Sequence, residues 1–127
     1  MTNKLEVPYR YRARLKRVVD GDTFDLVVDL GHRTQIITRY RLRGVDTPEI
    51  RGEEREEGVA AAEFAHNWFF PVLAALGDAS PWPLVIDTHK DETGRYGRWI
   101  ADIYEASTGE SLADALVSNG HAEVINP

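Results

Sequence analysis

Three short polar clusters stand where apolar segments end, and their residue types could together hydrolyse a phosphate ester. The clusters are Asp20-Gly21-Asp22-Thr23, then Arg41 with Asp46-Thr47-Pro48-Glu49, then Arg95-Tyr96-Gly97-Arg98. Taken singly, each has a structural explanation: a hairpin turn, a helix start and a glycine-containing turn. Taken together they supply carboxylates and arginines in complementary numbers, provided that the fold brings the three segments to one place.

The chemistry that this set of side chains suits is hydrolysis of a phosphodiester. Two Asp carboxylates and a backbone carbonyl form a site of hard oxygen donors, which is appropriate to Ca²⁺. The ion would act as a Lewis acid on a phosphoryl oxygen, and a nearby Glu could accept the proton of the attacking water. Two arginines could hold the phosphate through paired hydrogen bonds and stabilise the charge of the transition state.

Alternating and β-branched segments predict the strands that must position these clusters. Residues 9–19 alternate between apolar and basic side chains, and Asp-Gly then marks a turn into a second strand over residues 23–30. A third strand is predicted over roughly residues 34–44, with Arg39, Arg41 and Arg43 facing outward. The doublet Ile36-Ile37 breaks its alternation and predicts a bulge.

The second half of the chain predicts two helices and two further strands. Residues 50–58 read as a charged surface loop, and residues 59–70 as a helix that Pro71 should end or kink. The apolar stripe of that helix is expected at Val59, Ala62, Ala65 or His66, and Phe69. Strands are predicted over residues 84–89 and 97–106, followed by a helix that starts at Ser111 and ends before Gly120.

The resulting order, βββ-α-ββ-α, predicts an α+β fold: a five-stranded OB-fold Greek-key β-barrel. One helix should lie between strands three and four, and the other at the C-terminal side. With 127 residues, the chain is expected to form one domain over residues 1–127. Closing such a barrel can bring separate strand ends to one mouth.

Composition narrows the classes of function. The net charge of −6 argues against an evenly basic nucleic-acid surface, but 12 of the 15 Lys and Arg residues lie among the first 57 residues, so a local basic patch stays possible. Absence of cysteine excludes thiolate catalysis and Cys-based zinc sites, and the four histidines show no metal-ligand spacing. No segment reads as a membrane span or a signal peptide, so we expect a cytoplasmic protein, or a secreted one if a leader has been removed.

The motifs resemble those of the staphylococcal (micrococcal) nuclease family, whose domain is called SNase-like or thermonuclease. The matching strings are VVDGDTFDL, YRLRGVDTPE, GRYGRWIADIY and SLADALVSNGHAEV, in the same order from about Arg14 to Val124. DGDT alone is a weak signal, whereas RLRGVDTPE followed by YGR is a strong one. The resemblance implies a calcium-dependent endonuclease that cleaves DNA and RNA and leaves 3′-phosphate ends. We expect a monomer with no membrane partner.

By this resemblance, the acidic residues hold one Ca²⁺ and activate water. Asp22 and Asp46 correspond to the calcium carboxylates, and the Thr47 carbonyl to a further ligand. Glu49 corresponds to the proposed general base, and Asp20 would stand next to the metal ligands without binding the ion.

The same resemblance assigns the basic residues to phosphate. Arg41 and Arg98 correspond to the catalytic arginines that grip the reacting phosphate. Arg95 and Tyr96 match positions that bind a second phosphate of the substrate.

The main alternative is a non-catalytic SNase-like OB-fold module that binds nucleic acid or a protein partner. A degenerate copy should have lost a catalytic or metal residue, and this chain keeps all five: Asp22, Arg41, Asp46, Glu49 and Arg98. Its acidic loop, with glutamates at 53, 54, 56 and 57, departs from the lysine-rich loop of the family and would either repel phosphate or simply be solvated.

Aromatic residues raise a separate expectation. Asn126 and Pro127 stand where the family has a tyrosine that contacts the nucleotide, so we expect weaker base stacking and a higher KM. Trp68 and Trp99 are expected to pack in the core.

Overall fold

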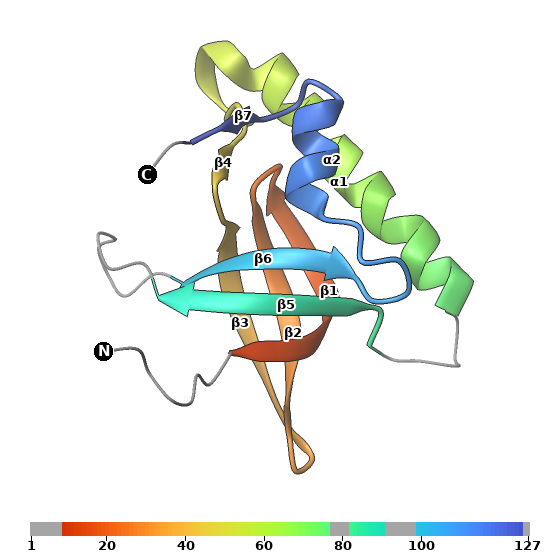
Figure 1. The fold of residues 1–127 in the computed structure, drawn as a ribbon. Coiled ribbons are helices and arrows are strands. Elements are labelled where there is room, and N and C mark those ends of the chain that lie inside the picture. The colour runs from red at the N-terminus through yellow and green to blue at the C-terminus, as the bar shows by residue number, and fades with distance from the viewer. Residues whose placement is uncertain (1–8, 77–81, 91–98, 126–127) are drawn as a thin grey trace, which may run out of the picture.

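The computed structural model describes residues 9–76, 82–90 and 99–125, and the side chains of 71–76 are not among them (Figure 1). The elements in chain order are β1 Arg10–Asp20, β2 Thr23–Gly31, β3 Thr34–Leu42, β4 Val45–Asp46, the 3₁₀ helix η1 Gly52–Glu54, α1 Arg55–Leu76, β5 Leu84–Lys90, β6 Trp99–Glu105, α2 Leu112–Ser118 and β7 Glu123–Val124. Within these ranges no helix has the length and apolar character needed to cross a membrane.

Five of the strands close into a barrel in the order β1-β2-β3-β6-β5, with β5 also paired to β1. All neighbouring pairs are antiparallel except β3 and β6, which run parallel. Helix α1 connects the third barrel strand to the fourth, and α2 follows the fifth (Figure 1). The predicted α+β barrel of the OB type is therefore confirmed.

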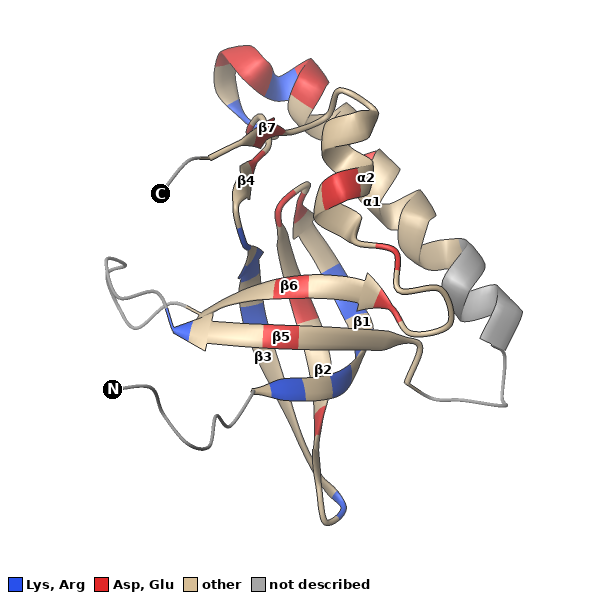
Figure 2. Ribbon diagram, viewed as in Figure 1, with Lys and Arg blue, Asp and Glu red and all other residues tan. Residues whose placement is uncertain are grey.

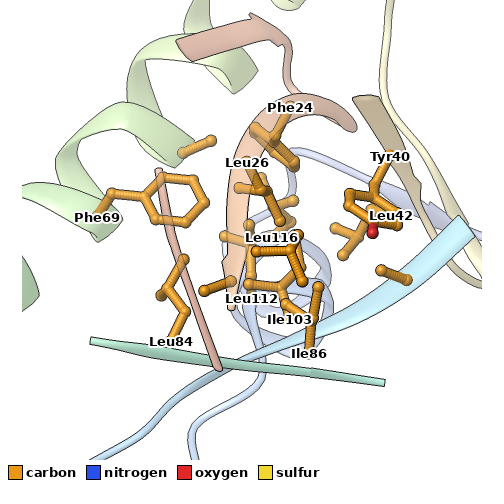
Figure 3. Packing of buried hydrophobic residues seen from close by; sticks show 14 of the residues in the cluster. Phe24, Leu26, Tyr40, Leu42, Phe69, Leu84, Ile86, Ile103, Leu112 and Leu116 are labelled. Atoms are coloured by element: carbon orange, nitrogen blue, oxygen red, sulfur yellow. The ribbon is translucent and has the colours of Figure 1, made fainter. Parts of the chain in front are cut away.

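The core fills the barrel and the space under the two helices (Figure 3). Alternate residues of β2, namely Phe24, Leu26 and Val28, are fully buried, as the period of a strand requires. Helix α1 contributes Phe69, whose ring meets Phe24 edge-on with 5.3 Å between centroids. Burial of each such side chain stabilises the fold by roughly 1.5–3 kcal/mol. The helices and the barrel therefore share one core.

The strand irregularities lie elsewhere than predicted. Ile36 and Ile37 pair regularly with Val28 and Val27, so the predicted bulge at this doublet is wrong. Both isoleucines are exposed, because the buried residues of β3, Tyr40 and Leu42, lie in its second half. Register shifts occur instead in β1, between Leu15 and Arg17 and again near Asp20.

Helix α1 begins earlier than predicted, and its buried stripe matches the prediction at Ala65 and Phe69 but not in the first turns. The predicted charged loop is a 3₁₀ turn followed by the first turn of α1, where Glu56 and Glu57 suit the positive end of the helix dipole. The buried positions are Gly58, Ala61, Ala65 and Phe69, so Val59 and Ala62 lie beside the stripe and His66 is exposed. The helix continues through Pro71 to Leu76, so Pro71 does not end it.

Helix α2 confirms the predicted caps. The Ser111 hydroxyl accepts a hydrogen bond from the Asp114 backbone N–H, and Gly120 follows the helix with a φ of 77°. Glycine adopts this left-handed conformation without a steric penalty. The chain thus turns back after α2 and reaches β7, which pairs with β4.

Candidate active site

One open pocket of about 520 Å³ gathers most of the predicted site residues. It is lined by Asp20, Asp22, Thr23, Arg39, Arg41, Asp46, Thr47, Pro48, Glu49 and Trp99. Six of the predicted residues are among these, so the first two polar clusters do meet. Arg95, Tyr96 and Arg98 lie outside the described residues. Figure 2 shows the acidic β1–β2 turn and β4 on the same side of the barrel as the arginines of β3.

Arg41 stands between two of the predicted metal carboxylates. Its Nη2 donates a hydrogen bond to Asp46 Oδ1 at 2.9 Å and lies 3.6 Å from Asp22 Oδ2. Arg41 is paired with Thr23 on the neighbouring strand, and the alternation of β3 turns its side chain away from the core while Tyr40 and Leu42 point inward. The strand therefore fixes the guanidinium at the rim where β2 begins.

Asp22 is buried, with 7% of its surface exposed, and its carboxylate links two segments. Oδ1 accepts a hydrogen bond from the Thr23 hydroxyl, and Oδ2 accepts one from the Thr47 backbone N–H, each at 3.1 Å. The Asp22 backbone carbonyl accepts from the Leu42 N–H at 2.7 Å. The β1–β2 turn is therefore bonded both to the end of β3 and to the segment after β4.

Asp20 shows that negative charge is concentrated here. Burial raises the pKa of the Asp20 carboxyl, and the charges of Asp22 and Glu49 raise it further. A carboxyl whose ionisation is opposed by its neighbours marks a place where a cation would be favourable.

The donors fit a hard divalent cation in type. Asp22 and Asp46 offer carboxylate oxygens that both contact the Arg41 guanidinium, and the buried Thr47 Oγ1, beside Gly21, has no hydrogen-bond partner among the described residues. Within the same residues no group of three or more His, Cys, Asp or Glu side chains forms a metal cluster.

Helix α1 holds both acidic turns through its smallest residues. Gly58 lies so close to the segment after β4 that an added Cβ would overlap the Glu49 carbonyl oxygen. One turn later, Ala61 packs on Gly21, where an added Cβ would lie 2.8 Å from the Ala61 Cβ and 3.0 Å from Thr47 Oγ1. We call these close approaches of Gly58 and Ala61 the α1 seam. No motif predicts this seam, and the signal for it in the sequence is Gly58, a glycine at the start of a helix.

Three further contacts hold β4 and the segment that follows it. Asp46 pairs with Glu123 in the two-stranded β4–β7 sheet, and the Ile125 N–H donates to the Gly44 carbonyl at 2.9 Å. The Glu54 carboxylate accepts a hydrogen bond from the Glu49 backbone N–H at 3.3 Å. One glutamate of the acidic segment is therefore directed at the site rather than only solvated.

The pocket also includes two residues that were not assigned to it. Arg39 donates to Asp25 through Nε and Nη2, at 2.8 and 3.2 Å, and these bonds lower the pKa of Asp25. Trp99 was expected in the core, but 42% of its surface is exposed, and it lines the pocket. The expectation for Trp68 is closer, since it packs partly buried against the core.

Comparison of the chain with protein-family models gives no match, and comparison with curated proteins gives none either.

Proposed function

We propose that this protein is a calcium-dependent endonuclease that hydrolyses phosphodiester bonds of DNA and RNA, leaving 3′-phosphate ends, in the manner of the staphylococcal nuclease family. The observation that carries the proposal is the position of Arg41, which contacts Asp46 and Asp22 in a pocket that Glu49 also lines. Such a hydrolysis requires two carboxylates, a general base and a positively charged side chain that binds phosphate, all at one rim.

Each residue has a definite role in this proposal. Asp22, Asp46 and the Thr47 carbonyl hold the cation, which when bound supplies Lewis-acid activation of a phosphoryl oxygen. Glu49 accepts the proton of the attacking water. Arg41 binds the phosphate through its parallel N–H groups and stabilises the charge that develops on it. Arg98, Arg95 and Tyr96 complete phosphate binding from a segment outside the described residues.

Cleavage of a labelled single-stranded DNA, with Ca²⁺ or with a chelator, tests the proposal. We expect cleavage only with the metal, and a rate about 10²–10³ lower in Arg41→Ala, since loss of one such donor typically has this effect. Arg43→Ala is the matched control, because it also removes an arginine, at the residue just after β3. The Arg43 side chain donates to Asp102 at 3.4 Å and does not line the pocket. Its rate should stay within a few-fold of the unmodified protein.

The contrary outcome is equally specific. A correctly folded protein that cleaves neither DNA nor RNA with any divalent ion is not a nuclease. Retained binding of the same oligonucleotides would then identify it as the non-catalytic module.

A further inference from the structure

Among the described residues that line the pocket, Trp99 is the only aromatic one. It is the first residue of β6 and pairs with Tyr40 of β3, the residue between Arg39 and Arg41. Neighbouring strands lie about 4.8 Å apart, so the backbone of Trp99 lies one strand away from the arginines of the pocket. Both Trp99 and Arg41 line the pocket.

The exposure of Trp99 is not what its place in the strand predicts. Its position has the same parity as Ala101 and Ile103, both fully buried. At the rim, however, the core ends and 42% of the tryptophan surface stays exposed. Because this side chain lines the pocket, and ligand pockets are typically lined by aromatic side chains together with a few polar groups, Trp99 is a candidate for contact with a ligand.

The other two tryptophans have partners within the protein, in contrast to Trp99. Trp68 donates its indole N–H to Glu110 and packs edge-on against Phe69. Arg14 lies over the ring of Trp82, 4.8 Å from its centroid. Within the described part of the chain, no ring or cation contacts the indole face of Trp99. The exposed part of Trp99 instead lines the pocket.

We propose that Trp99 binds a nucleobase of the substrate by stacking, while Arg41 holds an adjacent phosphate; this inference rests on the proposed nuclease function. A stacking contact accepts any base, because every base has a π-face. It adds affinity and leaves the reacting groups unchanged. Trp99 is thus a substrate-binding residue whose effect appears in KM rather than in kcat.

Kinetics on two oligonucleotides test the assignment. One is a short deoxythymidine oligonucleotide, and the other carries stable abasic analogues on both sides of the cleaved phosphate. Base stacking of typical strength predicts that the normal substrate has a roughly 5- to 150-fold lower KM. In Trp99→Leu this preference should vanish with kcat nearly unchanged, and in Trp99→Phe most of it should remain. Ile37→Ala, which removes an exposed apolar residue of the β2–β3 hairpin, is the control and should behave as the unmodified protein.

Fluorescence separates failure of this inference from failure of the proposed function. With Trp68 and Trp82 replaced by phenylalanine, Trp99 is the remaining emitter. We expect saturable quenching by the deoxythymidine oligonucleotide in Ca²⁺ and little by the abasic one. Equal discrimination by Trp99→Leu, or no base-dependent quenching, overturns the role of Trp99, whether or not cleavage occurs. Base-dependent quenching without any cleavage would support Trp99 and reject the nuclease.

Discussion

Arg41 and Asp46 contact each other, and each is also proposed to bind a ligand. Their contact therefore competes with phosphate binding at Arg41 and with cation binding at Asp46. The Arg41 guanidinium lies 2.9 Å from the Asp46 carboxylate and neutralises its charge. A bound cation would take over that neutralisation and leave the guanidinium available to phosphate. The Arg41 guanidinium and the proposed cation therefore compete for the Asp46 carboxylate. Binding of the cation should release the guanidinium to bind the phosphate of the substrate.

Replacing Asp46 by Asn should abolish most of the stabilisation that calcium gives. At a 100-fold excess over its Kd, Ca²⁺ bound at the proposed site would stabilise the folded protein by about 2.7 kcal/mol and raise Tm by several degrees. Asp46→Asn removes one of two carboxylate ligands, and its Tm should hardly respond to Ca²⁺. Thermal unfolding with and without Ca²⁺ measures this. Asp102→Asn, on β6 and outside the pocket, should respond as the unmodified protein does; equal responses of all three would exclude Asp46 as a ligand.

Single residues could be predicted when their chemical type and motif were decisive. Asp22, Asp46, Thr47 and Glu49 were chosen by type and motif, and they do line one pocket. Trp99 was assigned to the core because large apolar residues are mostly buried. Its exposure depends on where β6 meets the rim of the barrel, which no local pattern reveals.

At the scale of elements, the α1 seam decides how the two acidic turns sit together. Hydrophobicity predicts Ala65 and Phe69 of the buried stripe correctly, but in the first two turns it favours Val59 and Ala62 over the observed Gly58 and Ala61. The closest contact between a helix and a turn uses the smallest side chains. Gly58 and Ala61 carry little apolar surface, so a hydrophobicity pattern does not mark them as the interface. The short strands β4 and β7 were missed for a related reason: two-residue strands exist only through their tertiary pairing.

Gly58→Ala provides a direct test of the seam. Helix propensity alone predicts that Ala stabilises the helix by about 1 kcal/mol relative to Gly. We expect the opposite sign, a loss of about 1–3 kcal/mol, because the added Cβ overlaps the Glu49 carbonyl and must displace the turn. Urea unfolding gives the sign. Stabilisation by Gly58→Ala would refute the close packing. Ala60→Gly, on the exposed face of α1, is the control and should cost about 1 kcal/mol by propensity.

At the scale of the whole molecule, the barrel is closed by the β1–β5 pair, which an exposed ion pair reinforces. Arg10 pairs with Asp87 in the register and donates to it through Nε and Nη2, at 2.7 and 2.9 Å. The Arg10 guanidinium lowers the pKa of the Asp87 carboxyl below its ordinary value of 3.8. The folded state therefore favours the ionised carboxylate more than the unfolded state does.

The pH dependence of Asp87→Asn follows from this direction. The contribution of Asp87 is complete above the unfolded pKa and is lost as pH falls through the lowered folded pKa. We expect Asp87→Asn to lower Tm by about 1–3 °C at neutral pH, since exposed pairs contribute little, and by less as pH falls below about 3.5. Thermal unfolding across pH measures the difference. A deficit that grows in acid would have the wrong sign, and Glu63→Gln, an exposed change on α1, should show no such trend.

The order of the barrel strands and both helices could be predicted because each leaves a period in the sequence, 2 for strands and 3.6 for helices. The meeting of the first two polar clusters followed from barrel closure. Bulges in β1, the early start of α1 and the pairing of β4 with β7 could not be predicted, because each depends on contacts between segments far apart in the chain.

The β4–β7 pair has one more consequence. Asp46, proposed to hold the cation, is paired with Glu123, and Ile125 is bonded to Gly44 just before it. Whatever stabilises β4 therefore opposes fraying of the chain after α2, and by thermodynamic reciprocity a well-ordered β7 strengthens binding at Asp46. Binding of the proposed cation at Asp46 and pairing of β7 with β4 are therefore expected to be thermodynamically linked, each favouring the other.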